Sequence, residues 1–442
     1  MKKLLFFALL LALAVLVPTT VMAQQIPLRF MYYIDASQAG YAEDQAIWQK
    51  FKDDNPDIDL QMEILFNNPY HEKLGAYIAA GNIPDVIYMW PSEKSSSAIL
   101  HEMHLMKDLT PLLGKDFLSH FVSVALDPKQ QATGYLAELP QSVTYTTVVY
   151  ANKKLLADNG FGLPKTYADL KKMVPALKAK GVQVITIPDG DGWQMQSCLF
   201  STVVGRMLGN DWVNAVKTGK AKFTDPGYVA ALTFISDMFK DGVIPRADMT
   251  LGYGDGPNLF VTGKAAMIID GDWRQGFYIT DKSTGQALIP PDKQASDFAF
   301  INFPAIPGEK YPGVVSAIAG VGLGIAKAVP AGSDREKAAV RLLKYYYSPE
   351  VQKVKLETGA FIPTLKGVTS DKLEPFTQMM PKYYASINKI SYVLDGVLDP
   401  GVCNNYVNKG LQEIGLGTKT PAQVALETEK AMADWRSAQV AQ

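Results

Sequence analysis

The fold is decided between residues 26 and 89, where two helical patterns separate three apolar stretches: IPLRFMYY (26–33), IDLQMEI (58–64) and DVIYM (85–89). The middle stretch alternates apolar and polar residues, which is typical of a half-exposed strand at a sheet edge. The segments 41–55 and 70–80 each place apolar residues on one helical face. Strand, helix, strand, helix and strand in this order predict a parallel sheet with right-handed crossovers and helices on both faces.

The same pattern restarts later in the chain. Residues 147–150 are β-branched or aromatic and predict a strand, and further strands are expected at 184–187 and 265–269. Thr166 and Ser333 each precede an acidic residue by three positions, which predicts a capping box at a helix start. Since 442 residues at ~100 to 200 per domain make two domains or more, we expect a second α/β lobe.

Composition excludes several classes of protein. Hydrophobic residues make up 48% of the chain and charged residues 20%, which rules out a disordered or fibrous protein. Lys and Arg number 43 against 44 Asp and Glu, so the formal charge is −1. Because nucleic-acid binding needs a strongly basic surface, no nucleic-acid partner is expected.

Residues 1–23 have the pattern of a secretory signal peptide. Lys2 and Lys3 precede the apolar run 4–17, and small residues up to Ala23 suit a signal peptidase. The run is shorter than the ~20 residues that a membrane helix needs. No cysteine lies near the expected cut, so we expect an exported, soluble, periplasmic protein without a lipid anchor.

Cys198 and Cys403 are the two cysteines of the chain. In an oxidising compartment they could form a disulfide, but a chain of this size does not need one, and two buried thiols are the alternative.

Motifs for catalysis and metal binding are missing from the sequence. It has no G-x-S-x-G, H-E-x-x-H, G-x-x-x-x-G-K-[ST] or C-x-x-C, so we predict neither an enzyme nor a cofactor. His101 and His104 lack a third ligand and are expected to be a solvated surface pair, without a metal. Asp189 and Asp191 flank a glycine turn, where the sequence does not decide whether a calcium ion binds.

Aromatic and polar residues gather where predicted strands end. In open α/β sheets, ligands lie at the carboxyl ends of the strands. A sugar offers an apolar ring face to Trp or Tyr and hydroxyl groups to polar side chains. Trp48, Trp212 and Trp435 lie in helical stripes and are expected in the core. The strand-end residues are Tyr33, Asp35, Asn67, Asn68, Trp90, Asp272, Trp273 and Arg274, with a further cluster at Asp191, Trp193 and Gln194.

Five motifs in one order resemble those of extracellular solute-binding proteins of family 1, the carbohydrate-binding components of ABC importers. Residues 79–86 resemble A-x-G-x-x-P-D-V, and Phe260 to Met267 with Gly271 to Trp273 resembles F-x-x-G-x-A-A-M…G-x-W. Between them lie an L-P pair at 139–140, the Y-x-N-K segment 150–153 and the segment 160–167. The resemblance runs nearly end to end.

The resemblance implies a periplasmic-binding-protein fold: two α/β lobes, each a mainly parallel sheet flanked by helices, with the ligand cleft between them. It implies an N-terminal lobe of residues 24–138 plus about 312–359, and a C-terminal lobe of about 139–311 plus 360–442. The expected function is high-affinity binding of a mono- or short oligosaccharide, followed by hinge closure and delivery to the transmembrane subunits of an ABC permease. A monomer is expected.

The resemblance also implies roles for single residues. Trp273 is expected to be the main stacking platform, followed by Trp90, Tyr145 and Tyr33. Tyr406 and its asparagine neighbours occupy a stretch where relatives that bind malto-oligosaccharides have further aromatics, which favours a smaller sugar. The expected hydroxyl partners are Asp35, Asn67, Asn68, Gln141, Ser142, Asp272 and Arg274.

Two alternatives stay open. One is a binder of a non-sugar polar solute. The other is a secreted glycoside hydrolase, for which Asp270 and Asp272 are the one close carboxylate pair considered, although their short turn does not fix the ~5 to 9 Å separation that such an enzyme needs.

Overall fold

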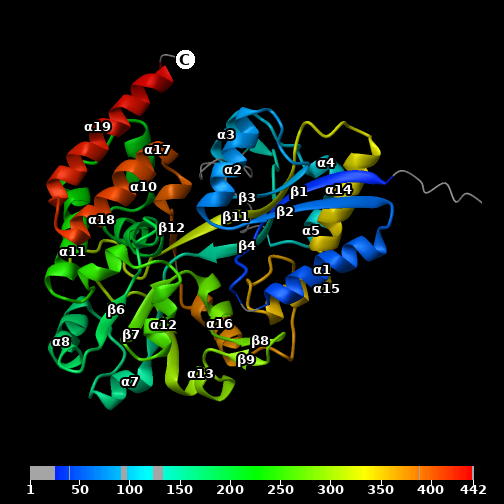
Figure 1. Ribbon diagram of the computed structural model, residues 1–442. Helices are drawn as coiled ribbons and strands as arrows, with labels where there is room; N and C mark the ends of the chain where they lie inside the picture. The colour runs from blue at the N-terminus through cyan, green and yellow to red at the C-terminus, as the bar shows by residue number, and fades with distance from the viewer. Residues whose placement is uncertain (1–24, 39, 91–96, 123–132, 388, 441–442) are drawn as a thin grey trace, which may run out of the picture.

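The computed structural model describes residues 25–38, 40–90, 97–122, 133–387 and 389–440. These residues form two lobes, each built on its own sheet and flanked by helices (Figure 1). The expected signal peptide lies outside the described residues. In the described ranges, no helix is long and apolar enough to cross a membrane.

The first sheet has the strand order β12-β11-β3-β1-β2, with β4 paired to β11. Its strands are β1 (Ile26–Tyr33), β2 (Ile58–Leu65), β3 (Val86–Met89), β4 (Leu139–Tyr145), β11 (Val315–Ile325) and β12 (Ile390–Ser391). β1 pairs in parallel with β2 and with β3, and β2 forms the edge, so the predicted parallel pairing and the edge position of β2 are confirmed. β11 runs antiparallel to β3 and β4.

The second sheet corrects the expectation of a mainly parallel arrangement. Its order is β10-β5-β7-β6, with β5 (Val148–Asn152), β6 (Gln183–Thr186), β7 (Ala265–Asp270) and β10 (Phe298–Ile301). Among these described strands, only β6 and β7 pair in parallel, whereas β5 is antiparallel to β7 and β10. The reason is the way β5 enters the lobe: it follows β4 directly, so its first residue, Val148, pairs with Asp270 at the end of β7.

Helices cover both sheets. Those of the first lobe are α1 (Tyr41–Asp54), α2 (Asn68–Ala79), α3 (Ser97–Glu102), α4 (Thr110–Leu113), α5 (Lys115–Ser119), α14 (Asp334–Tyr346) and α15 (Pro349–Glu357). Those of the second lobe are α7 (Lys153–Asp158), α8 (Tyr167–Lys178), α9 (Ser201–Met207), α10 (Asn210–Lys217), α11 (Pro226–Lys240), α12 (Asp255–Val261), α13 (Pro291–Asp297), α16 (Pro375–Ala385), α17 (Pro400–Val402), α18 (Lys409–Leu416) and α19 (Pro421–Val440). Thr166 caps α8 in the predicted capping box. Ser333 caps α14, but the side chain of Glu336 accepts from the backbone nitrogen of Gly332 rather than from that of Ser333, so only half of the second predicted box forms.

Each lobe has its own hydrophobic core. Trp48 is buried in the core of the first lobe, as its helical position predicts. In the second lobe β5 alternates: Val149 and Ala151 pack into one core cluster, and Val148 and Tyr150 pack into a second cluster on the opposite face. This period of two is what a strand buried on both faces produces. The exact lobe boundaries remain a prediction.

Four buried hydroxyl groups hold the two lobes together where chain segments cross between them. Thr146 and Thr147 connect β4 to β5, Ser316 lies at the start of β11, and Thr202 lies on α9. The Thr147–Thr202 and Thr146–Ser316 oxygen pairs are each 2.7 Å apart, and the Thr202–Ser316 pair is 2.9 Å apart. Because each hydroxyl group can both donate and accept, the cluster satisfies buried polar groups without a charge.

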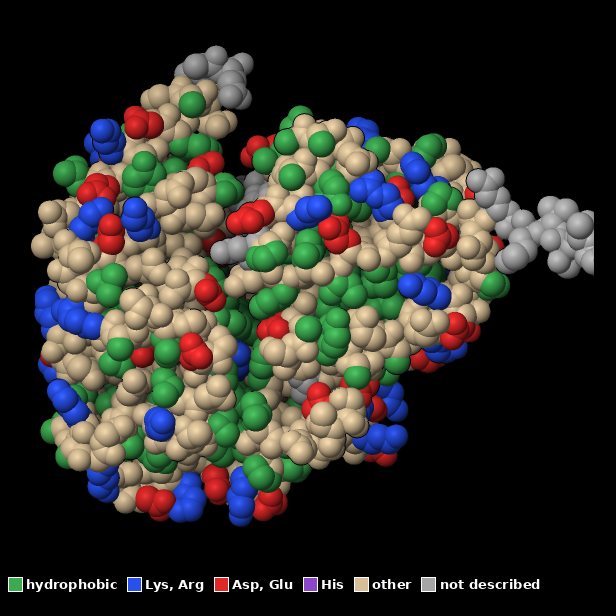
Figure 2. All heavy atoms as spheres, in the orientation of Figure 1, with side chains coloured by type: hydrophobic (Ala, Val, Ile, Leu, Met, Phe, Trp, Pro, Cys, Tyr) green, Lys and Arg blue, Asp and Glu red, His purple; other side chains and the backbone are tan. Residues whose placement is uncertain are grey.

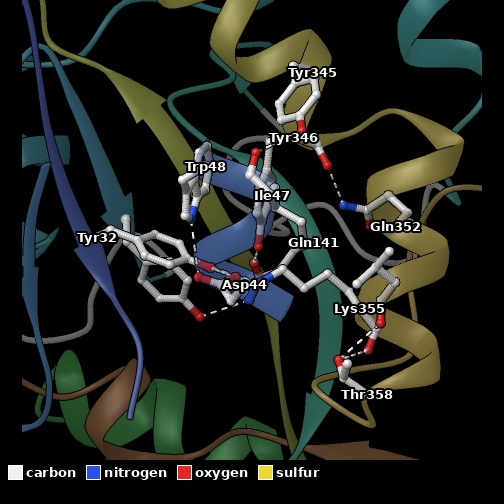
Figure 3. Close-up of polar contacts among 12 residues, drawn as sticks. Tyr32, Asp44, Ile47, Trp48, Gln141, Tyr345, Tyr346, Gln352, Lys355 and Thr358 are labelled. Carbon is white, nitrogen blue, oxygen red and sulfur yellow. Dashed lines mark hydrogen bonds and ion pairs between the residues drawn. The ribbon is translucent and has the colours of Figure 1, made fainter. Parts of the chain in front are cut away.

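The first lobe contains a buried ion pair between α1 and α15 (Figure 3). Asp44 pairs with Lys355, and both side chains are at most 4% exposed. Asp44 also accepts hydrogen bonds from Tyr32 Oη, at 2.9 Å, and from Trp48 Nε1, at 3.1 Å. Residues more than 300 positions apart therefore depend on one carboxylate.

We expect Lys355→Met to lower the free energy of unfolding by about 3 to 5 kcal/mol, because the variant leaves Asp44 buried without its cation. The double variant Asp44→Asn/Lys355→Met should be clearly more stable than Lys355→Met alone. Lys353→Met, at a 47% exposed lysine of the same helix, should stay within about 0.5 kcal/mol of wild type. Urea unfolding measures all three, and a double variant that is no more stable than Lys355→Met would contradict the coupling.

Candidate functional site

A cavity of about 750 Å³ lies between the two lobes, and residues of both lobes line it. Figure 2 shows the molecule hollowed between the lobes. The carboxyl ends of β1 and β3 from one lobe and of β7 from the other point residues into this cavity. It therefore lies at the strand ends where ligands of open α/β sheets bind.

The first-lobe wall of the cavity consists of Tyr33 and Trp90 with the rings around them. Tyr33 ends β1, and Trp90 follows β3. Their ring centroids are 4.9 Å apart at an angle of 86°, and Tyr88 stacks on Tyr33 at 5.4 Å. Trp90 is only 8% exposed, yet it lines the cavity. Burial raises the pKa of Tyr33, so its hydroxyl group stays protonated and can donate a hydrogen bond.

Polar residues border this wall. Asp35 accepts hydrogen bonds from the backbone nitrogen and the hydroxyl group of Ser37, at 2.8 and 2.7 Å, which fix its carboxylate at the cavity rim. Asn67 lines the cavity with a φ of 55°. A positive φ is uncommon in residues other than glycine, and such residues cluster at ligand sites.

The second-lobe wall consists of Trp193, Tyr253, Trp273 and Phe277. Trp193 lies 5.0 Å from Tyr253 and 6.2 Å from Trp273, measured between ring centroids. The indole of Trp273 lies flat on Gly271: a Cβ at that position would come within 2.1 to 2.4 Å of three ring carbons. The glycine of the G-x-W motif is thus required by the tryptophan, since its own φ of −79° suits any residue.

Gln141 and Asp272 form part of the polar lining. Gln141 donates to Tyr88 Oη at 2.9 Å and accepts from Tyr346 Oη at 2.6 Å. Asp272 accepts from the backbone nitrogen of Tyr145 at 3.0 Å and from Tyr384 Oη at 2.8 Å. Burial raises the pKa of Asp272 to about 7, although both hydrogen bonds oppose this rise.

The structure brings most of the expected site residues to this cavity. Ten of them line it: Tyr33, Asp35, Asn67, Trp90, Gln141, Ser142, Asp191, Trp193, Asp272 and Trp273. Tyr145, Gln194 and Arg274 are not among the lining residues. Tyr145 instead stacks on Tyr384 at 4.5 Å, and Arg274 is fully buried in an ion pair with Asp270. The side chain of Asn68 lies outside what the structure describes.

These positions correct two expectations. Arg274 does not reach a ligand because its guanidinium group points beneath the wall, toward Asp270, rather than into the cavity. His101 is not a solvated surface residue, because it is buried 3.1 Å from Glu138. Among the described residues, no group of three or more His, Cys, Asp or Glu side chains could hold a metal ion.

The two cysteines are both buried thiols. Cys198 Sγ lies 3.8 Å from Asp270 Oδ1, and Cys403 Sγ lies 3.7 Å from Asn408 Oδ1. The structure therefore favours the second of the two alternatives that the sequence left open.

Several lining residues were missed by sequence reasoning. Some, such as His71, Lys355 and Phe361, are scattered along the chain. One group comes from residues 395–412, which include the end of the 3₁₀ turn η5 (Leu394–Gly396), helix α17, the π-helix η6 (Cys403–Asn408) and the start of α18. π-helical turns are rare and frequent at functional sites, but they leave no pattern in a sequence. Tyr406 is 40% exposed and is not among the lining residues, whereas its neighbour Asn404 is. The missed residues of this segment are Asp395, Pro400, Asn404, Asn408, Lys409 and Gln412.

Two α/β lobes around an aromatic and polar cavity define a binding protein that holds its ligand between its lobes. The comparison with known families agrees: residues 35–353 match the family of bacterial extracellular solute-binding proteins, and the chain belongs to that family.

Individual relatives are more distant. The multiple sugar-binding protein of Streptococcus mutans is 22% identical over 346 residues, which cover 75% of either chain. Among solved structures, a chitin oligosaccharide binding protein matches with a TM-score of 0.81 and 22% identity, covering 93% of this chain and 99% of the other. A maltose-bound T. maritima protein matches with a TM-score of 0.72 and 19% identity, covering 93% of this chain and all of the other. The two structures confirm the expected two-lobed α/β fold.

We expect Gly271→Ala to displace the Trp273 indole, because the added methyl group would overlap the ring. Overpacking of this kind lowers the free energy of unfolding by about 1 to 3 kcal/mol. Gly254→Ala is the matched control, since Gly254 has helical angles and no atom lies within 4 Å of the place that its added methyl group would take. Urea unfolding and near-ultraviolet circular dichroism check both variants, and equal behaviour of the two would contradict the packing argument.

Asp272 should make the free energy of unfolding depend on pH. Its pKa is about 7 in the folded protein and about 3.9 when unfolded. At pH values between these two pKa values, Asp272 carries a proton in the folded state but not in the unfolded state. The free energy of unfolding should therefore fall as pH rises through this range, by up to about 1.4 kcal/mol per pH unit.

Asp272→Asn should remove this part of the slope, whereas Asp292→Asn, at a 71% exposed carboxylate, should keep it. Urea unfolding between pH 4 and 8 compares the three proteins. Parallel curves for wild type and Asp272→Asn would show that Asp272 does not take up a proton on folding.

Proposed function

We propose that this protein binds a mono- or short oligosaccharide outside the cytoplasm and delivers it to an ABC permease. The observation that carries the proposal is the pair of aromatic walls, one from each lobe, that face a single cavity with carboxylate and amide groups between them. Aromatic rings suit the apolar faces of sugar rings, and charged or amide groups suit their hydroxyl groups. The names of the relatives, which bind multiple sugars, chitin oligosaccharides and maltose, support the same ligand class.

Binding is coupled to closure of the two lobes. A ligand that first contacts one wall gains contacts to the other wall only in the closed form, so it shifts the equilibrium toward closure. Micromolar affinity requires about 8 kcal/mol in total. Rings stacked on Trp273 and Tyr33, together with hydrogen bonds to groups such as Asp35 and Asn67, supply interactions of this order. A monomeric, periplasmic protein would present this closed form to the permease.

A glycoside hydrolase fits the cavity less well. Of the one carboxylate pair considered, only Asp272 lines the cavity, whereas Asp270 is fully buried and paired with Arg274. A hydrolase needs two carboxylates that both reach the sugar. Incubation with aryl glycosides tests this directly, since any turnover would contradict a pure binding protein.

A thermal-shift screen over mono- and oligosaccharides, with amino acids and polyamines as the non-sugar arm, tests the ligand class. A ligand at 100 times its dissociation constant adds about 2.7 kcal/mol of stability. Stabilisation by a polyamine or an amino acid, and by no saccharide, would overturn the sugar assignment.

Trp273→Ala should weaken saccharide binding at least tenfold, about 1.4 kcal/mol, because it removes a ring of the second-lobe wall. Trp435→Ala is the control, because Trp435 lies on α19, packs against the core of the second lobe and does not line the cavity. Isothermal titration calorimetry with the sugar found in the screen measures both variants. Unchanged affinity in Trp273→Ala would remove this residue from the site.

A further inference from the structure

The Trp273 ring is held from two sides. Gly271 lies against its face, and its Nε1 donates a hydrogen bond to Tyr253 Oη at 2.6 Å. Tyr253 itself lines the cavity but is only 7% exposed. The tyrosine hydroxyl group therefore sets the direction in which the edge of the indole points.

A buried ion pair lies directly beneath these rings. Tyr253 Oη donates to Asp270 Oδ1 at 3.4 Å, and Asp270 Oδ2 accepts from Arg274 Nε. The guanidinium carbon of Arg274 lies 4.0 Å from the ring centre of Tyr253 and 4.5 Å from that of Phe277. Arg274 thus contacts two rings of the second-lobe wall without reaching the cavity.

The contacts of Arg274 indicate that it orients aromatic rings rather than stabilises the fold. Its Nη1 and Nη2 atoms are buried and have no hydrogen-bond acceptor in the part of the chain that the structure describes. Unpaired buried donors are costly, and an ion pair of this kind often adds no stability over apolar residues. A planar cation between two aromatic rings, however, fixes the orientation of both, which a lysine ammonium group cannot do.

We propose that Asp270, Arg274 and Tyr253 form a positioning unit that holds the rings of Trp273 and Phe277 in the orientation that the ligand requires. This proposal rests on the proposed sugar-binding function. Arg274, which the sequence suggested as a hydroxyl partner, is then a positioning residue that acts on the ligand through the rings.

Tyr253→Phe tests the unit, because it removes only the oxygen that accepts the indole hydrogen bond and keeps the ring over Arg274. The six tryptophans give separate indole N–H signals in a ¹⁵N spectrum, and Trp273→Phe identifies the signal of Trp273. We expect Tyr253→Phe to move this signal in the ligand-free protein and to weaken saccharide binding about fivefold to tenfold. Tyr228→Phe, a buried tyrosine of the same lobe outside the cavity lining, should change neither.

Arg274→Lys is the second variant, since it keeps a positive charge beside Asp270 but removes the planar guanidinium group. It should fold and should weaken saccharide binding in the same direction. Unchanged affinity in both variants, or an unmoved Trp273 signal in Tyr253→Phe, would overturn the positioning unit. Failure of wild type to bind any saccharide would refute the proposed function instead, and the indole signal, read without ligand, would still show whether Tyr253 holds Trp273.

Discussion

The crossing between the lobes depends on four buried hydroxyl groups that hydrogen-bond to one another. Thr146, Thr147 and Ser316 lie on the crossing segments, and Thr202 on α9 ties these segments to the second lobe. Strand β4 of the first sheet ends at this junction, and strand β5 of the second sheet begins there. The cavity lies beside the junction, since Thr146 is one of its lining residues. Since hydroxyl groups can rotate and exchange partners, the junction can stay satisfied while the lobes move relative to one another.

The sequence predicts the first lobe well because its signals are local. Period-two alternation in β2, helical periodicity in α1 and α2 and strand–helix order between residues 26 and 89 determine three strands and two helices. The antiparallel direction of β5 could not be predicted in the same way. It depends on the point at which the chain leaves β4 and enters the second lobe, and not on the residues of β5. The pairing of Asp44 with Lys355 is equally hidden, as it joins residues far apart in the chain.

The site was predictable to the extent that it lies at strand ends. Tyr33, Trp90 and Trp273 reach the cavity because each lies at or just after the end of a strand that runs toward it. The polar segment that contributes Asn404 includes a π-helix, η6, whose extra residue per turn breaks the ordinary helical periodicity of the sequence. Arg274 illustrates a different limit: two residues from an aspartate that lines the cavity, it points the opposite way because a 3₁₀ turn, η4 (Asp272–Phe277), follows the strand.

The packing of Trp273 on Gly271 also constrains how this loop can diverge. Trp273 can be exchanged for a smaller residue while the glycine remains, which alters the wall without steric conflict. The reverse order is disfavoured, since any side chain at Gly271 overlaps the indole and displaces it while the tryptophan is still present. Descendants with a different ligand preference should therefore have replaced Trp273 first. They would keep glycine at position 271 even though the ring that required it is gone.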